Sequence, residues 1–524
     1  MTKDFSHSTL GYIIGLDREN TIQYRGIKYA SLDHQFAEPV LFSNKEKLTI
    51  DATSYGSACI QNPAARDLEF GFIQHTLPSE DSHFSGTECL SLNITTPKTD
   101  KRHLPVFIFI HGGGFSIGGN SWPHYDPTRL VEISMEKGTP VIGININYRL
   151  GLAGFLTSEE LVRAGIKSNN GLRDQRTALT WIQKYVEGFG GDPENVTVVG
   201  ESAGGASCLF LLESQQPLFK RLMSMGGTPL LVKPLPSHVA ESIYAAVVDK
   251  LGLTAASSES RIKVFKEATV EELVAATSNF PLLPVIDGDV VTVPATYPQW
   301  SFQENLLPGT KWCESIMIGD CEMDSSILFY MLHDRLDKMN KDFISSTERS
   351  LDSTTRKELL EEYDVTHPGD SPDAAINNVL HFAHDIGFYA PVVAIASGWP
   401  GKSYVFHFNE PNPWGGRFQG VAGHVLDVAF LFQNYNEFLD ETQQSSAKAF
   451  GSHFIDFVAG LEPFPVYTAG EGGAMVYGPG DEGQKFVKSK RNADYKRRDT
   501  IFKLAKISDF DKLSACWDTF MGGR

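Results

Sequence analysis

Alternating strand and helix signals run through the first half of this chain and constrain its fold more than any other feature. Residues 104–114 and 140–151 are apolar, β-rich runs, and a helical stretch around 130–137 separates them. A helical repeat over 173–190 then leads into a short apolar strand at 196–199. Because the order β-α-β-α-β is typical of a parallel, doubly wound sheet, we expect an α/β protein.

The second half carries weaker signals of the same kind. Two further strands are predicted at 315–318 and 404–408, and they extend the same sheet. Residues 332–370 are rich in charge and in Ser and Thr, which favours solvated helices inserted over the sheet. Such an insertion could cap a site at the sheet edge.

Length and charge narrow the classes of protein. At about 150 residues per domain, 524 residues suggest roughly three domains, a count that α/β folds with insertions often violate. The 46 basic and 64 acidic residues give a net charge of −18, spread along the chain, which argues against nucleic acid and anionic membranes as partners. We find neither a signal-peptide pattern nor a run of about 18 apolar residues. This predicts a cytoplasmic protein, or a secreted one if a signal was removed.

A serine stands at the sharpest predicted turn. Gly200-Glu201-Ser202-Ala203-Gly204 has the form GxSxG and lies between the strand at 196–199 and a helix-forming run from Gly205. A turn of this kind holds the serine Oγ clear of the backbone and needs small neighbours on both sides. The strand-turn-helix context predicts that Ser202 is a nucleophile. Glu201 beside it is equally consistent with a role in the field of the site and with a structural role.

A glycine run ends the earlier strand at His111-Gly112-Gly113-Gly114-Phe115. Residues without side chains let backbone N–H groups approach a developing oxyanion closely. We assign the oxyanion hole to the N–H groups of Gly113, Gly114 and Ala203, each donor lost costing about 3 to 4 kcal/mol. His111 is expected to be structural. A phosphate loop is excluded because the run lacks a GKS or GKT ending.

The partner of the serine is not decided by the residues alone, because eight histidines follow it. His407 lies inside a predicted strand and is expected to be a satisfied sheet residue. His381 and His384 are expected on one helix, where further metal ligands are missing. His424 lies on a loop after the strand, which suits a mobile imidazole.

The chain resembles the type-B carboxylesterase/lipase family, which includes carboxylesterases, cholinesterases and fungal lipases. Six motifs follow the family's order: YRGIKYA at 24–30, ECLSLN at 88–93, HGGGF at 111–115, NYRLG at 147–151, GFGGDP at 188–193 and GESAGG at 200–205. The resemblance implies an α/β-hydrolase fold, one catalytic domain over 1–524, and cap segments at roughly 60–88 and 230–370. It implies no cofactor and no metal.

The resemblance also chooses the triad. The family's G-x-x-H-x-x-D/E segment resembles residues 420–427 and implies His424 as the base. Its G-D-x-x-D-E-G motif, aligned without gaps, puts Asp324 in the acid position, where the family usually has Glu. The shorter side chain requires the imidazole or the loop to lie closer. Glu322 and Asp320 are the alternatives.

Cysteine and aromatic positions bear on compartment and substrate. Cys59 and Cys89 match the family's first disulfide, which would form in an oxidising compartment and stay reduced in the cytosol. The loop between them contains no Trp, whereas cholinesterases use an aromatic residue there to hold a quaternary ammonium. Choline esters are therefore disfavoured.

These features together predict a serine esterase that acts on a small-molecule ester through an acyl-enzyme on Ser202. The same acyl-enzyme could instead serve an acyltransferase, lactonase or cyclase acting on a specialised metabolite. A non-catalytic cholinesterase-like binding protein is the alternative from another class, and such proteins usually lack a triad member. The sequence leaves the oligomeric state and the natural ester open.

Overall fold

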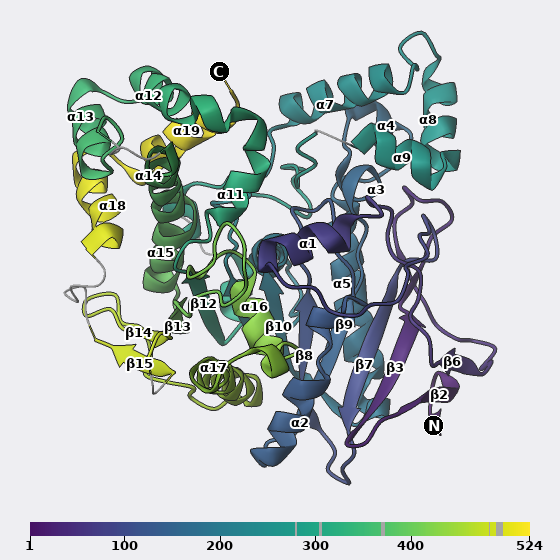
Figure 1. Cartoon of the computed structure of the whole chain (residues 1–524). Helices are drawn as coiled ribbons and strands as arrows, with labels where there is room; N and C mark the ends of the chain where they lie inside the picture. Colours follow the sequence, from purple (N-terminus) through teal and green to yellow (C-terminus); the bar gives the residue numbers. More distant parts are fainter. Residues whose placement is uncertain (278–279, 303–306, 368–371, 481–482, 489–495, 524) are drawn as a thin grey trace.

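One large sheet organises the molecule (Figure 1), and the computed structural model describes it over residues 1–277, 280–302, 307–367, 372–480, 483–488 and 496–523. Thirteen strands join in this sheet within the described residues. They are β1 (Thr2–His7), β2 (Gly11–Asp17), β3 (Thr21–Lys28), β6 (Ile50–Ala52), β7 (Ser91–Pro97), β8 (Leu104–Ile110), β9 (Ile142–Ile146), β10 (Gly191–Glu201), β11 (Arg221–Met225), β12 (Ser315–Cys321), β13 (Lys402–Phe408), β14 (Ala474–Tyr477) and β15 (Gln484–Val487).

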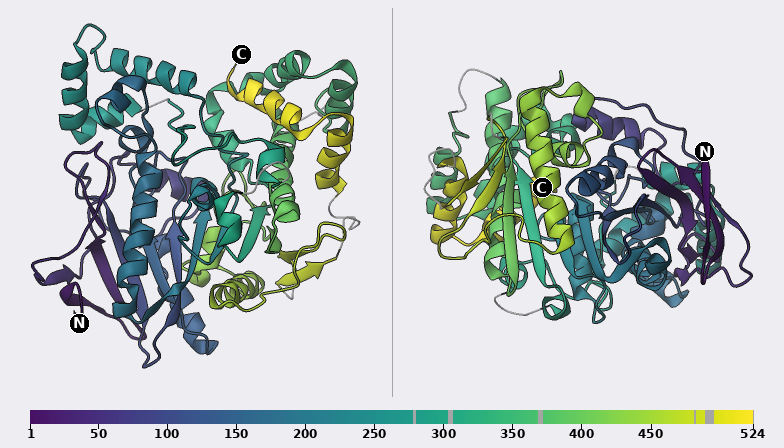
Figure 2. Two further views of the ribbon diagram at one scale, coloured as in Figure 1. Left: turned by 180° about the vertical axis from the view of Figure 1, so that it is seen from behind. Right: turned by 90° about the horizontal axis from the view of Figure 1, so that it is seen from below.

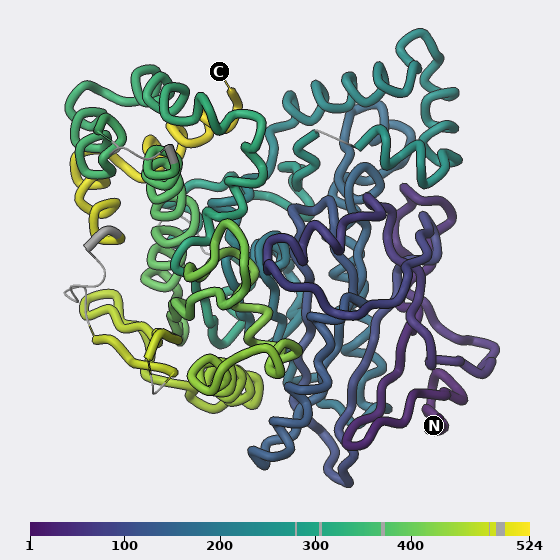
Figure 3. Tube along the Cα trace, viewed as in Figure 1, coloured from purple at the N-terminus to yellow at the C-terminus, as the bar shows by residue number. Residues whose placement is uncertain are grey.

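The strand order is β1-β2-β3-β7-β9-β8-β10-β11-β12-β13-β14-β15, with β6 beside β2. Neighbouring strands from β9 to β14 in this order are parallel. The pairs at both ends are antiparallel, apart from β2 with β6. Figure 3 shows the amino-terminal strands at one edge of the molecule and the carboxy-terminal strands at the other. The α/β class predicted from the sequence is confirmed.

Helices cover both faces of the parallel strands (Figure 2), which explains why the middle residues of those strands are mostly apolar. Along β8, Val106 and Ile108 join one buried hydrophobic cluster, and Phe107 and Phe109 join a second. One face is covered by α5 (Asn170–Tyr185), α6 (Ala203–Phe210) and α15 (Ala390–Gly398). The other face is covered by α2 (Thr128–Glu136), α16 (Leu426–Phe432) and α17 (Glu441–Ala459).

Element boundaries agree with the sequence prediction to within a few residues in most places. The predicted strands at 315–318 and 404–408 correspond to β12 and β13, which are each longer than expected. The apolar run at 140–151 contains the shorter strand β9, after which α3 (Gly151–Phe155) begins. The strand before the serine turn, predicted at 196–199, extends over all of β10.

Two inserted regions lie toward one end of the sheet. The first carries α1 (Ala65–Ile73) between Cys59 and Cys89. The second carries α7 (Ser237–Lys250), α8 (Ser258–Glu267), α9 (Val270–Thr277), α12 (Met339–Ser350) and α13 (Ser353–Glu362). Helices α7 to α9 and helices α12 and α13 form two separate groups beyond the same end of the strands (Figure 1).

A long apolar helix packs against β12 and β13. It is formed by α14 (Pro372–His384), the π-helical turn η6 (Asp385–Tyr389) and α15. Over Asp373–Gly398, 26 residues long, it is long and apolar enough for a membrane span by length and composition. However, most of its apolar stretch is buried inside the protein, as expected for a core helix.

Candidate active site

Ser202 lies on the sharp turn between β10 and α6. Its backbone has φ +54° and ψ −122°, a positive-φ conformation that residues with a Cβ rarely adopt. Its N–H donates to Met225 O at 2.8 Å, which ties the turn to the end of β11. Gly200 lies so close to Gly204 that a Cβ would stand 2.3 Å from the Gly204 carbonyl. The turn therefore requires the small residues that the motif supplies, and it keeps its strain at the serine.

Two glycines after β11 bring other side chains to this turn. A Cβ on Gly227 would collide with the Ser202 carbonyl. A Cβ on Gly226 would lie 2.9 Å from Asp324 Oδ1 and 3.3 Å from His424 Cε1. The nucleophile turn and the Asp324–His424 pair thus lie against one dipeptide that has no room for larger side chains.

Asp324 and His424 form a buried pair. Asp324 Oδ1 accepts a hydrogen bond from His424 Nδ1 at 2.7 Å, and the N–H of Cys321 donates to Asp324 Oδ2, also at 2.7 Å. The N–H of Met323 donates to Ala422 O at 2.9 Å, which joins the loop after β12 to the loop that carries the histidine. Because this hydrogen bond holds the two loops together, Asp324 reaches the imidazole although its side chain is shorter than that of glutamate.

The other predicted candidates for the acid are placed elsewhere. Asp320 lies on β12, and its carboxylate contacts two other histidines. These contacts are with His407 Nδ1 at 2.5 Å and His384 Nε2 at 3.2 Å. His407 is therefore a satisfied sheet residue, as expected, and His384 lies on α14. Glu322 is exposed. Among the three carboxylates, Asp324 is the one that the structure pairs with His424.

The glycine run that carries two of the predicted oxyanion donors contacts the serine turn through Gly112. Gly113 and Gly114 have φ +90° and +59°, and a Cβ on Gly112 would lie 3.0 Å from Ser202 Cβ. Ala203 is the first residue of α6, where N–H groups have no partner within the helix. Within the described residues, we find no backbone carbonyl that accepts from the N–H of Gly113, Gly114 or Ala203. Their role as oxyanion donors stays a prediction.

Two further buried carboxylates surround the imidazole, and sequence reasoning gave neither a definite role. Glu201 Oε1 lies 3.1 Å from His424 Nε2. Burial raises the pKa of Glu201 well above its ordinary value, and Asp427, Glu69 and Asp324 raise it further. Burial also raises the pKa of Asp427 to about 7, with Asp324 adding to the shift. The spacing of Asp427, three residues after His424, was the signal available in the sequence.

A buried cluster around Glu69 connects α1 to the region of Glu201 and His424. Glu69 is buried, and its Oε1 accepts from His124 Nε2 at 2.8 Å and from the hydroxyl of Tyr125. No sequence motif indicated this cluster. It fixes the inserted helix α1 to the core beside Glu201.

The structure also places His111 and the cysteine pair. His111 is buried and stacks on Tyr148 with ring centroids 4.4 Å apart. Cys59 and Cys89 are buried, adjacent free thiols, and the pKa of Cys59 is raised by burial and by its hydrogen bond with Cys89. In the described part of the chain, we find no group of three His, Cys, Asp or Glu residues arranged to hold a metal ion.

A serine on a strand-turn-helix motif within this mostly parallel sheet defines the α/β-hydrolase fold. The family model described as "Carboxylesterase family" matches residues 6–474, and this chain belongs to that family. It is a carboxylic ester hydrolase.

Similarity extends over nearly the whole chain. Lipase 3 of Yarrowia lipolytica is 29% identical over 473 residues, covering 86% of this chain and 87% of the lipase. The para-nitrobenzyl esterase of Bacillus subtilis is 28% identical over 476 residues, covering 85% and 88%. A solved structure of a PNB esterase has a TM-score of 0.75 at 22% identity and covers 96% of this chain and 100% of that one. The solved structure supports the fold, and the family and its curated members support the reaction class.

Proposed function

We propose that this protein hydrolyses small-molecule esters through an acyl-enzyme on Ser202. His424 Nε2 takes the proton of Ser202 Oγ as that oxygen attacks the ester carbonyl, and the N–H groups of Gly113, Gly114 and Ala203 stabilise the oxyanion. Collapse of the tetrahedral intermediate breaks the bond to the alcohol oxygen, which leaves with the proton from His424. Water then attacks the acyl-enzyme by the same route and releases the carboxylic acid.

The observation that carries this proposal is the convergence at Gly226 and Gly227. The Ser202 backbone packs against Gly227, and the hydrogen-bonded Asp324–His424 pair packs against the adjacent Gly226. Asp324 orients the imidazole and stabilises its charged form without taking its proton. Water must stay excluded for these charges to act strongly, and the burial of both partners supports that condition.

We further propose that residues 1–524 form one catalytic domain and that the segments at about 60–88 and 230–370 cap the site, the second apart from strand β12 and the loop with Asp324, which belong to the sheet and the site. Helix α1 reaches the loop that carries His424, because Gln74 accepts a hydrogen bond from the Phe418 N–H at 2.9 Å. Phe72 of α1 also packs on Tyr330 of α11 (Ser326–Met331), with ring centroids 5.1 Å apart. Tyr330 follows the loop with Asp324, so the segment at 60–88 contacts residues next to both partners of the serine.

The test compares wild type with Ser202→Ala on p-nitrophenyl esters of increasing acyl length. The expected loss in kcat is roughly 10⁶-fold, the size seen when a triad nucleophile is removed. Ser207→Ala is the matched control, because Ser207 lies on the same helix and its Oγ donates to the Ala203 carbonyl at 2.8 Å. Ester hydrolysis that persists in Ser202→Ala would refute the nucleophile, and the acyl-length profile would separate an esterase from a lipase.

The compartment stays a prediction that Cys59 and Cys89 can test. They lie side by side as thiols, a reducing cytosol would keep them so, and an oxidising compartment would favour a disulfide. Mass spectrometry after alkylation under non-reducing conditions should find both cysteines modified in protein taken from its native cell. A disulfide between them would instead support secretion.

A further inference from the structure

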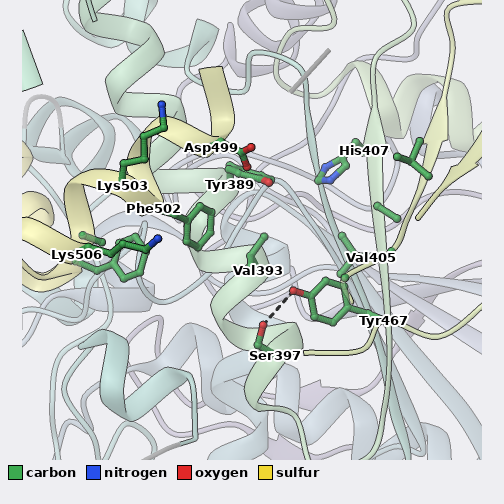
Figure 4. Close-up of a pocket in the computed structure, with 16 residues that line it drawn as sticks. Tyr389, Val393, Ser397, Val405, His407, Tyr467, Asp499, Phe502, Lys503 and Lys506 are labelled. Carbon is green, nitrogen blue, oxygen red and sulfur yellow. Dashed lines mark hydrogen bonds between the residues drawn. The ribbon is translucent and has the colours of Figure 1, made fainter. Parts of the chain in front are cut away.

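A second cavity lies away from the serine, between the carboxy-terminal strands and helices (Figure 4). It has a volume of about 590 Å³, within the range of small-molecule sites. Its walls come from β13, β14, β15, α15, α18 (Lys496–Ile507) and the start of α19 (Phe510–Met521). None of the residues assigned to the triad or the oxyanion hole lines it.

The body of this cavity is apolar and partly aromatic. Val405 of β13, Val393 of α15 and Phe502 of α18 point into it (Figure 4), and Tyr389 and Phe510 complete the wall. A neighbouring cavity of about 460 Å³ shares Val393, Phe502 and Phe510. The two cavities therefore share an apolar wall.

The charge at the cavity wall is opposite to that of the protein as a whole. The net charge is −18, yet α18 has five basic residues and one acidic residue in the sequence KRRDTIFKLAKI. Lys503 and Lys506, one turn apart on this helix, both line the cavity. Asp499 is the acidic member, so the lysines leave a positive excess.

These two lysines are not neutralised by the protein. Lys503 Nζ lies 4.0 Å from Glu362 Oε2 in an exposed pair, which is worth little. Lys506 has no ion pair with any residue that the structure describes. Arg498 of the same helix differs, because it lies 3.6 Å from buried Asp320 and so has its counter-charge inside the protein.

We propose that this cavity is a second, non-catalytic binding site for an apolar monocarboxylate. The hydrocarbon body occupies the space lined by Val393, Val405 and Phe502, and the carboxylate lies toward Lys503 and Lys506. The aliphatic stems of the lysines extend the apolar wall, and their ammonium groups stay in water where they meet the anion. A carboxylic acid with an apolar body is also what hydrolysis of an apolar ester would release, but the site does not depend on that reaction.

Photo-crosslinking locates the ligand without relying on activity. A decanoate analogue with a mid-chain diazirine is irradiated with the full-length protein, and labelled peptides are mapped by mass spectrometry. We expect labels within 389–397 and 499–510 that excess decanoate suppresses. Labels confined to peptides that contain Ser202 or His424 would refute the second site, whereas they would leave the esterase proposal standing.

Calorimetry tests the ligand class. Octanoate should bind more tightly than octanol or octylamine, and Lys503→Gln with Lys506→Gln should weaken octanoate binding roughly tenfold and remove its advantage over octanol. Lys341→Gln, an exposed lysine on α12, is the charge-matched control and should change nothing. Val393→Trp should block binding by filling the cavity. Equal affinity for octylamine, or unchanged octanoate binding in the double variant, would overturn the proposal, even if Val393→Trp does not fold.

Discussion

In the described part of the chain, two buried Asp–His pairs connect the same two segments. One segment is the end of β12 with the loop after it, and the other is β13 with the loop after it. Asp320 and Asp324 lie four residues apart at the end of β12, and each contacts the Nδ1 atom of a histidine, His407 or His424. His407 lies within β13, whereas His424 lies on the loop that follows it. The geometry of the two contacts is similar, so their surroundings must explain any difference in role.

The surroundings differ in fixed positive charge. Burial alone would raise the pKa of Asp320, but Arg498, His407 and His384 outweigh burial and hold the pKa well below its ordinary value. For Asp324 the effect of burial is larger than the opposing effect of His424, so the pKa is raised. Asp320 is therefore a permanently ionised structural group.

This contrast explains why one pair suits catalysis. In the proposed mechanism, Asp324 gains its counter-charge when His424 takes the proton of Ser202, which is the moment at which the reaction needs stabilisation. Asp320 has a counter-charge at all times, so its interaction would not change along the reaction. A buried Asp–His contact alone is therefore weak evidence for a triad.

The two histidines should separate activity from stability. His424→Ala should lower kcat/KM roughly 10⁵- to 10⁶-fold because the proton acceptor is lost. His407→Ala should keep activity within about tenfold but lower the free energy of unfolding by about 3 kcal/mol, because a buried pair loses one partner. Ester kinetics and urea unfolding of both variants measure this. Comparable activity losses in the two variants would contradict the contrast.

The sequence predicts the serine turn and the glycine run well, but it predicts the aspartate that pairs with the histidine less well. The serine turn and the glycine run depend on local backbone geometry, which small residues at fixed spacing reveal, as at Gly200 and Gly204. The choice between Asp320 and Asp324 depends on Arg498, which is 174 or more residues away in the chain. Packing of that kind leaves no local pattern. The Glu69 cluster was missed for the same reason.

Substitutions of the two aspartates should also separate activity from stability, with a smaller loss of activity than in the histidine variants. Asp324→Asn should reduce kcat about 10⁴-fold, because the amide no longer selects the correct histidine tautomer. Asp320→Asn should keep activity within about tenfold and destabilise the fold by about 3 kcal/mol, because buried Arg498 loses its counter-charge. Since the folded-state pKa of Asp320 is lowered, its contribution is complete above about pH 4 and disappears as the pH falls further. The stability difference from wild type should shrink there, and a constant difference would count against this assignment.

Asp427 should give the opposite pH dependence. Its folded-state pKa of about 7 lies above the unfolded value, so the folded protein binds more protons between about pH 4 and 7. This group therefore makes stability fall as the pH rises through that window, by up to roughly 1.4 kcal/mol per pH unit. Asp427→Asn should flatten the slope measured by urea unfolding from pH 5 to 7. An unchanged slope would show that Asp427 does not titrate in this range.

Glu201 should show the smallest effect. Burial and the nearby carboxylates raise the pKa of Glu201 well above its ordinary value and so favour the neutral acid, although Glu201 Oε1 lies 3.1 Å from His424 Nε2. Gln has nearly the same shape and no charge, so Glu201→Gln should keep kcat/KM at pH 7 within about threefold of wild type, since uncharged Gln reproduces the protonated state. The decisive measurement compares the pH–rate profiles of wild type and Glu201→Gln, because glutamine cannot ionise. A large loss at neutral pH would mean that Glu201 works as an anion beside the imidazolium, and the positive charge of His424 would then have two carboxylate partners instead of one.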